Sequence, residues 1–145
     1  PRQSARAVIP TIIAQAVSGQ SLKLGTLETT RDFTFAADTA RAFAMIGAAD
    51  AAIGEVINAG SGQEVTIRDV VIKIAKITGL ALTPESDEQR LRPAKSEVSR
   101  LLSDSSKAKR LAGWSAEVSL DDGLRRTVDW IREHIDLYRP QEYAV

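Results

Sequence analysis

The chain contains no cysteine and only one histidine, His134. The lack of cysteine excludes disulfide frameworks, thiolate metal sites and a cysteine nucleophile. It also fits a reducing compartment, so we expect a cytoplasmic protein. With one histidine and no thiolate, a metal site is not credible. His134 stands beside Glu133 near an expected helix end, and we interpret it as a solvated charge partner.

Net charge and long apolar runs are absent as well. Lys plus Arg and Asp plus Glu both number 19, so no overall field attracts nucleic acid or anionic lipid. No apolar run approaches the roughly 20 residues that span a bilayer. Pro10 and Thr11 interrupt the apolar stretch 7–17, which argues against a signal peptide. The chain begins at Pro1 rather than at methionine, so either residues have been removed or it is a piece of something longer.

What is present is a succession of helix and strand patterns. Proline is favoured at the first position of a helix, which predicts a helix over 10–17. Asp38 is a plausible N-cap for a helix through residue 49, and Thr66 and Asp69 have the spacing of a capping box. Further helices are expected before Gly113 and after Ser119, and short strands at 21–25, 33–35, 55–58 and 80–84. This alternation indicates an α/β fold with fewer strands than a complete doubly wound sheet needs.

Two of the expected helices carry apolar stripes that predict a buried core. The helix that Thr66 begins presents Ile67, Val70, Val71, Ile74 and Ile77 at helical spacing. The last helix presents Leu124, Val128, Ile131 and Ile135. Trp114 follows Gly113, the expected end of a short helix, as an apolar lid. A chain of 145 residues fits one domain with a core of its own.

Six short motifs follow one another along the whole chain. They are PRQ at 1–3, RDFTFAAD at 31–38, INAGSG at 57–62, Arg92-Pro93 with Glu97-Val98, DSSKA at 104–108 and LAGW at 111–114. In this order the motifs resemble the C-terminal part of the extended short-chain dehydrogenase/reductase family, the NAD-dependent nucleotide-sugar epimerases and dehydratases. That family shows Asn-x-Tyr-Gly-Pro-Arg-Gln, then Arg-Asp-Phe-x-Tyr-Val-x-Asp, then Tyr-Asn-x-Gly-x-Gly at the matching places.

The resemblance implies a partial, truncated version of the family's α/β fold. Residues 1–145 would form one nucleotide-sugar-binding C-terminal domain, with helices packed on few short strands and without the N-terminal Rossmann portion. The sequence around residues 3–10 and 90–93 resembles that of bacterial 4,6-dehydratases that act on UDP-N-acetylhexosamines. We therefore expect a nucleotide-diphosphate sugar, UDP-linked, as the ligand.

The chain departs from the family where the cofactor and the catalytic base belong. The family's dinucleotide site needs a Gly-x-x-Gly-x-x-Gly turn. Here only Gly60 and Gly62 are close enough, and Val65 stands where a third glycine would be. The only tyrosines are Tyr138 and Tyr143, and neither is followed by lysine in a Tyr-x-x-x-Lys pair. We therefore expect no cofactor in this chain, no catalytic residue and no activity of the chain alone; NAD is implied only for an intact enzyme.

Three arginines are candidates for the substrate diphosphate. The family places the arginine that matches Arg31 on the diphosphate, which a planar guanidinium can grip at two oxygens. The alternative is a surface arginine paired with Asp32. Arg90 and Arg92 share one face if their segment is extended, which suits a diphosphate but also a solvated basic edge.

The remaining candidates are further from the chemistry. Glu97 matches a carboxylate of the family that contacts the ribose or orders a loop. Ile9 and Pro10 occupy the entrance to the family's sugar pocket, although packing at a helix start explains them equally well. The loop 58–62 has the strand-to-helix geometry of a phosphate loop, but a turn that needs positive φ is the preferred interpretation.

Two functions of different classes remain open. The chain is either the substrate-binding portion of an NAD-dependent epimerase or dehydratase, or a stand-alone non-catalytic module that binds a ligand or itself. In the second case the alanine-rich stretch 38–52 and the Ile72 side of the third helix need cover. Association of two copies would cover them, so we expect a homodimer or a larger assembly.

Overall fold

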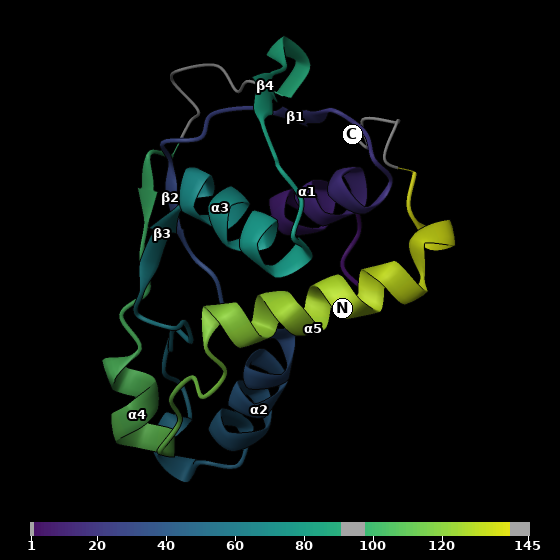
Figure 1. Ribbon diagram of the computed structural model, residues 1–145. Helices are drawn as coiled ribbons and strands as arrows, with labels where there is room; N and C mark the ends of the chain where they lie inside the picture. The colour runs from purple at the N-terminus through teal and green to yellow at the C-terminus, as the bar shows by residue number, and fades with distance from the viewer. Residues whose placement is uncertain (1, 91–97, 140–145) are drawn as a thin grey trace. The chain divides into compact units, whose positions relative to one another are not determined.

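The computed structural model describes residues 2–90 and 98–139. These residues form five α-helices, three 3-10 helices and five short strands (Figure 1). The mixed α/β class with few strands is therefore confirmed. The described residues divide into two compact units. The first holds residues 2–29, 66–90, 98–99 and 124–139, and the second holds residues 30–65 and 100–123.

The first unit is built from helices beside one small sheet. Its helices are α1 (Val8–Val17), α3 (Ile67–Thr78) and the part of α5 (Leu120–Glu133) that starts at Leu124, with η2 (Glu88–Arg90) and η3 (Ile135–Leu137). Strand β1 (Leu22–Leu24) runs parallel to β4 (Pro84–Ser86). Figure 1 shows α1, in purple, beside α3, in teal.

The core of the first unit lies where α1, α3 and α5 meet. Its fully buried branched side chains are Ile12, Ile13, Val70, Ile74, Leu124, Val128 and Ile131. The stripes predicted on the two helices are confirmed, except that Ile77 and Ile135 are only half-buried. Removing such side chains from water is the main stabilising contribution, of about 1.5–3 kcal/mol each.

Helix α3 begins and ends as predicted. The Asp69 amide donates to Thr66 Oγ1 at 3.0 Å, and the Thr66 amide donates to Asp69 Oδ2 at 3.3 Å, so the capping box is complete. The hydrogen bonds from Thr66 hold the pKa of Asp69 below its usual value. Gly79 ends the helix with φ 73°, a conformation that glycine adopts without a Cβ penalty.

Helix α1 begins two residues earlier than predicted. It starts at Val8, so Pro10 is its third residue and not its first. The amides of the first turn have no acceptor within the helix, and the missing N–H of Pro10 therefore costs no hydrogen bond there either. The Thr11 amide then donates to Ala7 O, four residues back, at 3.1 Å.

The second unit is built around a three-stranded sheet. Its strand order is β3-β2-β5, from β3 (Glu64–Thr66), β2 (Thr30–Asp32) and β5 (Arg100–Leu101). Strands β2 and β5 are parallel, with Thr30 opposite Arg100. The helical elements are α2 (Ala36–Gly47), η1 (Asp50–Ala52), α4 (Ser106–Ala112) and the first turn of α5. A small core of Ala42, Ala108 and Trp114 joins α2 to α4, and it confirms Trp114 as an apolar lid.

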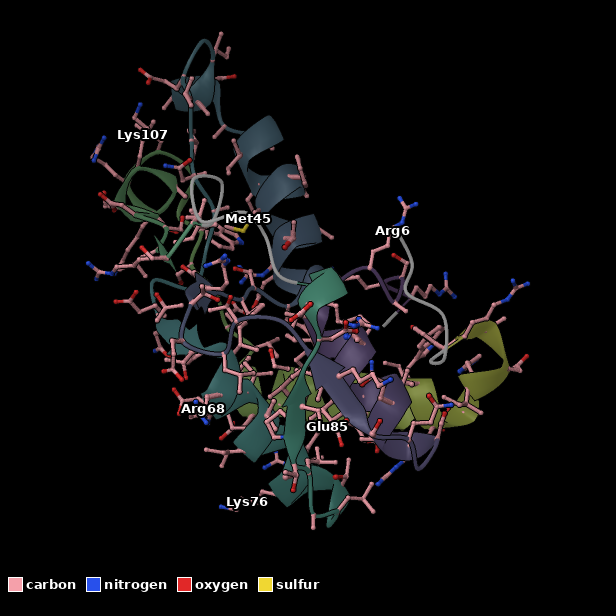
Figure 2. All side chains as sticks on the ribbon, turned by 90° about the horizontal axis from the view of Figure 1, so that it is seen from above. Arg6, Met45, Arg68, Lys76, Glu85 and Lys107 are labelled. Carbon is pink, nitrogen blue, oxygen red and sulfur yellow. The ribbon has the colours of Figure 1, made fainter. Side chains whose placement is uncertain are left out.

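Three strand predictions were misplaced. Residues 33–35 are not a strand, because α2 begins at Ala36 with Phe35 as its N-cap, and β2 lies just before them. Residues 55–58 are a loop, held by Lys107, whose Nζ donates to Glu55 Oε2 at 2.6 Å (Figure 2). Within 80–84 only Pro84 is in a strand. Strands of three residues are fixed by their partners, which periodicity does not reveal.

Within the described ranges, no helix is both long and apolar enough to cross a membrane.

Candidate functional site

Strand β2 carries Arg31, the first candidate ligand of the diphosphate. Arg31 lies opposite Leu101 in the parallel pairing with β5, and it is half-buried. Its Nη1 donates to the carbonyl oxygen of Thr30 at 2.7 Å, so the guanidinium lies against its own strand. A guanidinium carries five N–H donors in a planar fork.

Asp32, next along the strand, binds two loops of the second unit. Its carboxylate accepts from the Ser61 amide at 2.9 Å, from the Gly62 amide at 2.9 Å and from the Ser103 amide at 3.3 Å. The Ser61 hydroxyl donates to it as well. The carboxylate is thus engaged by backbone donors of distant segments, which gives Asp32 a structural role beside Arg31.

The loop after Asn58 is a turn and not an anion cradle. The Gly60 amide donates to Ser105 Oγ at 2.8 Å, and the next two amides donate to Asp32. A Cβ at Gly60 would lie 2.3 Å from the Cβ of Ser103, so the close approach of the two loops requires glycine. Gly62 has φ 73°. The preferred interpretation, a turn with positive φ, is confirmed, and three consecutive amides that could face a phosphate are already occupied.

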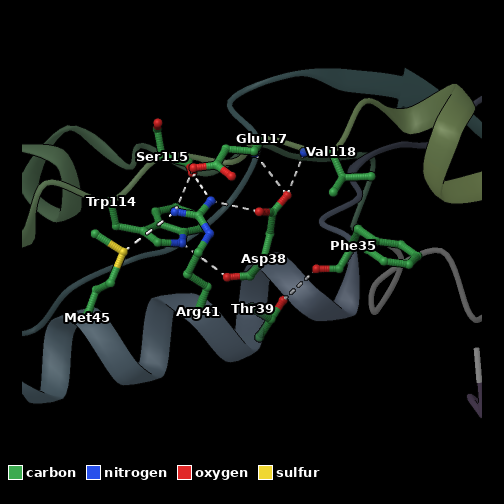
Figure 3. A network of polar contacts seen from close by, with 9 residues as sticks. All are labelled: Phe35, Asp38, Thr39, Arg41, Met45, Trp114, Ser115, Glu117 and Val118. Atoms are coloured by element: carbon green, nitrogen blue, oxygen red, sulfur yellow. Dashed lines mark hydrogen bonds and ion pairs between the residues drawn. The ribbon is translucent and has the colours of Figure 1, made fainter.

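Asp38, the last residue of the block 31–38, is a buried anchor (Figure 3). The prediction that it caps α2 is wrong, because Phe35 is the N-cap and Asp38 lies in the first turn of the helix. Its carboxylate accepts from Arg41 Nη2 at 2.8 Å and from the amides of Glu117 at 3.0 Å and Val118 at 2.9 Å. Asp38 therefore holds the segment that follows α4 against α2.

The surroundings of Asp38 keep it charged. Burial tends to raise the pKa of Asp38, but the bond from Arg41 and the two backbone bonds outweigh burial, and the pKa lies below its usual value. Arg41 also pairs with Glu117 at 3.1 Å and lies 5.9 Å from the ring centroid of Trp114. The Trp114 indole in turn donates to the Asp38 carbonyl oxygen at 3.1 Å. Its single polar atom is thereby satisfied inside the core.

A second ion pair crosses the sheet of the second unit. The Arg100 guanidinium donates to both oxygens of Glu64, at 2.7 to 2.9 Å, from one outer strand to the other. The Thr30 hydroxyl donates to Glu64 at 2.8 Å. Arg100 first and Thr30 second hold the pKa of Glu64 below its usual value. This pair straddles β2, the strand of Arg31.

Arg90 lies in the first unit, at the end of η2. Its Nε donates to Asp87 Oδ2 at 3.0 Å, and its side chain is 13% exposed. A Cβ at Gly25 would lie 2.5 Å from the Arg90 carbonyl oxygen, so η2 packs directly on the backbone beyond β1. Arg90 is thus a well-anchored residue, and its contact with a ligand stays a prediction.

The other candidates belong to the first unit or fall outside the described residues. Pro10 is fully buried in α1, whereas Ile9 is half-buried. Arg92 and Glu97 lie outside the described residues. Sequence reasoning missed the anchoring role of Asp32 and Asp38, although both stand in the block 31–38. Their roles depend on segments that only the fold brings near.

Comparison with known proteins adds the family. The GDP-mannose 4,6 dehydratase family model matches residues 1–127. A UDP-glucuronate 4-epimerase from Thermodesulfobacterium geofontis is 33% identical over 110 residues, which are 75% of this chain and 32% of that protein.

Solved structures agree with this match. A UDP-glucuronic acid 4-epimerase from Bacillus cereus, in complex with UDP-4-deoxy-4-fluoro-glucuronic acid and NAD, has a TM-score of 0.83 at 32% identity. The match covers 92% of this chain and 42% of that one. An epimerase from Methanothermobacter thermautotrophicus has a TM-score of 0.81 at 35% identity, over 90% of this chain and 38% of that one.

The chain spans between 20% and 42% of the length of the first three curated relatives that it matches. It corresponds to a part of their fold, as the few strands indicate. The chain belongs to the NAD-dependent nucleotide-sugar epimerases and dehydratases of the extended short-chain dehydrogenase/reductase family.

Proposed function

We propose that this chain is the nucleotide-sugar-binding portion of an NAD-dependent epimerase or dehydratase and is not catalytic by itself. The observation that carries the proposal is how the charged residues of the block 31–38 are arranged. Asp32 and Asp38 accept hydrogen bonds from backbone amides of the second unit, and Arg31 lies on the central strand of the same unit. A planar guanidinium is suited to two oxygens of a diphosphate.

The other candidates complete the proposed site. Arg90 and Arg92 are the further candidates for contact with the diphosphate, and Glu97 is the candidate for contact with the ribose or for ordering its loop. Ile9 is half-buried and would form part of the wall of the sugar pocket, whereas Pro10 is fully buried and would only support that wall from within. The chain would thereby orient the substrate, and orientation contributes a large part of catalysis in bound complexes.

NAD would bind to polypeptide other than this chain. In the intact protein NAD would accept the hydride from C4 of the sugar. The proposal is supported by the loop 58–62, where the amides of Gly60, Ser61 and Gly62 donate to the protein itself. No tyrosine is followed by lysine at the family's spacing.

The proposed substrate class is a UDP-linked sugar. Relatives named for UDP-glucuronate, UDP-glucose and other UDP-sugars support this class. Both epimerases and dehydratases are among the relatives, so the proposal covers either reaction. The lack of cysteine supports a cytoplasmic location as a part of the same proposal.

The proposal is tested by titrating the chain with UDP, UDP-N-acetylglucosamine and NAD while recording amide shifts by NMR. This chain would supply only a part of the substrate site, and a partial site binds weakly. We therefore expect saturation by UDP at about millimolar concentration, with shifts of the amide signals of residues 30–32 and their neighbours. NAD should cause no saturable shift. Saturable binding of NAD with none of UDP would overturn the proposal.

An alternative function, self-association, is favoured by apolar side chains at the two predicted places. Phe43 on α2 is 78% exposed and Ile72 on α3 is 59% exposed. We would expect light scattering to give a dimer or larger species at high concentration. Phe43→Glu should then restore a monomer, and Ala44→Glu, a matched change at an exposed neighbour, should not. A monomer at every concentration contradicts this alternative.

A further inference from the structure

The first unit contains a cavity of about 600 Å³, and none of Arg31, Arg90, Ile9 and Pro10 is among its lining residues. It is lined by residues 2–5 and by Trp130, His134, Leu137, Tyr138 and Arg139. The volume lies within the range of small-molecule sites, about 300–1,000 Å³. The cavity therefore has room for an organic ligand.

The aromatic wall of the cavity is fixed in place. The rings of Trp130 and His134 are stacked, with centroids 4.4 Å apart and planes at 10°. The ring of Tyr138 meets Trp130 edge-on at 6.1 Å. His134 Nδ1 lies 2.8 Å from the Trp130 carbonyl oxygen, and the Tyr138 hydroxyl donates to Gln3 O at 2.9 Å. A preorganised aromatic surface loses little freedom when a flat ligand binds to it.

The charged side chains among the described lining residues of the cavity have one sign. Arg2 and Arg139 contribute guanidinium groups, and no Asp or Glu is among the nine lining residues. Arg2 has φ 63°, and it is the one non-glycine residue with positive φ in the described part of the chain. Such a conformation is uncommon, and outliers of this kind gather at binding sites.

We propose that this cavity binds a small aromatic anion, such as an aryl phosphate. The ring of the ligand lies against Trp130 and Leu137, and its anionic group pairs with the guanidinium of Arg2. A guanidinium forms charge-assisted, bidentate bonds to phosphate or carboxylate. The lining includes none of Arg31, Arg90, Ile9 and Pro10, so the proposal stands or falls independently of the proposed function.

The test is an NMR titration with phenyl phosphate that follows the two indole N–H signals. Trp130 lines the cavity, and Trp114 is fully buried in the second unit and serves as the internal reference. We expect a saturable shift of the Trp130 signal and none of the Trp114 signal. Inorganic phosphate and neutral phenol, which each carry half of the chemistry, should bind at least about tenfold more weakly. The affinity for UMP is compared with that for phenyl phosphate. Tighter binding of UMP would identify a nucleotide as the preferred source of the ring and the anion, and weaker binding a simple aryl phosphate.

Two arginine variants make the test specific. Arg2→Ala should weaken phenyl phosphate by about tenfold. Arg6→Ala removes the same charge from an exposed side chain four residues away that does not line the cavity (Figure 2), and its affinity should stay within about twofold. Unchanged amide spectra of both free variants establish that they are folded. An absent Trp130 shift, or equal losses in the two variants, would overturn the proposal.

Discussion

The two units of this protein are held together by different kinds of interaction. In the first unit, branched apolar side chains from α1, α3 and α5 form the core, and seven of them are fully buried. In the second unit, the buried apolar residues are two alanines and Trp114. Its segments are joined instead by the carboxylates of Asp32 and Asp38.

The difference has a physical consequence. Apolar burial is roughly proportional to area and does not depend on pH, whereas a buried carboxylate must stay charged and hydrogen-bonded. The stability of the second unit should therefore fall sharply when a single polar group is removed. The stability of the first unit should fall when side-chain volume is removed from its core.

The largest effect should come from the core of the first unit. Ile74 is fully buried, so Ile74→Ala should lower the free energy of unfolding by about 3–4 kcal/mol through lost burial and a cavity. Ile72→Ala on the same helix removes the same atoms from a side chain that is 59% exposed, and it should cost less than about 1 kcal/mol. Urea unfolding measures both. Equal losses would contradict the account of this core.

The second effect concerns the anchor of the second unit. Asp38→Ala leaves two amides without their acceptor and removes one of the acceptors of Arg41, so it should lower the free energy of unfolding by about 3 kcal/mol. Asp50→Ala, at an exposed position of η1, is the matched control and should change it by less than about 0.5 kcal/mol. If Asp38→Ala proves as mild as its control, the second unit is not held by this carboxylate.

A third effect tests the close approach of two loops in the second unit. Gly60→Ala should cost about 2 kcal/mol, because the new Cβ meets Ser103. Gly47, at the end of α2, has no atom within 4 Å of an added Cβ. Gly47→Ala should therefore stabilise the chain by about 0.5–1 kcal/mol. Thermal unfolding of the two variants should show shifts of opposite sign.

The smallest effect is the dependence of the second unit on pH. Because the folded state lowers the pKa of Asp38 below its ordinary value of 3.8, its contribution is complete above that value and is lost as the pH falls through the folded pKa. The stability difference between the natural chain and Asp38→Asn should be constant near neutral pH and shrink in acid. Urea unfolding at several pH values measures it. A difference that is the same at every pH would mean that the charge of Asp38 is irrelevant.

How far the sequence predicts this structure depends on the range of the interactions. The capping box of Thr66 and the left-handed Gly79 were predicted, because both act within one turn of a helix. The anchoring role of Asp38 was not, because its amide partners are 79 and 80 residues away. The strands were misplaced for the same reason, since β2 is defined by its pairing with β5.

The candidate site divides in the same way. Arg31 was identified from a motif, and the structure adds its place on a central strand. The neighbouring Asp32 accepts hydrogen bonds from the amides of Ser61 and Ser103. This role could not be predicted, because the loops that contain the two serines approach Asp32 only in the folded chain.

The affinity of Arg31→Ala for UDP tests the central claim most directly. Arg68→Ala is the control, since Arg68 is an exposed arginine of α3 that pairs with Glu28 at the surface. We predict that Arg31→Ala weakens UDP by about tenfold or more and that Arg68→Ala leaves the affinity unchanged. If UDP binds to Arg31→Ala as tightly as to the natural chain, the guanidinium of Arg31 does not hold the diphosphate.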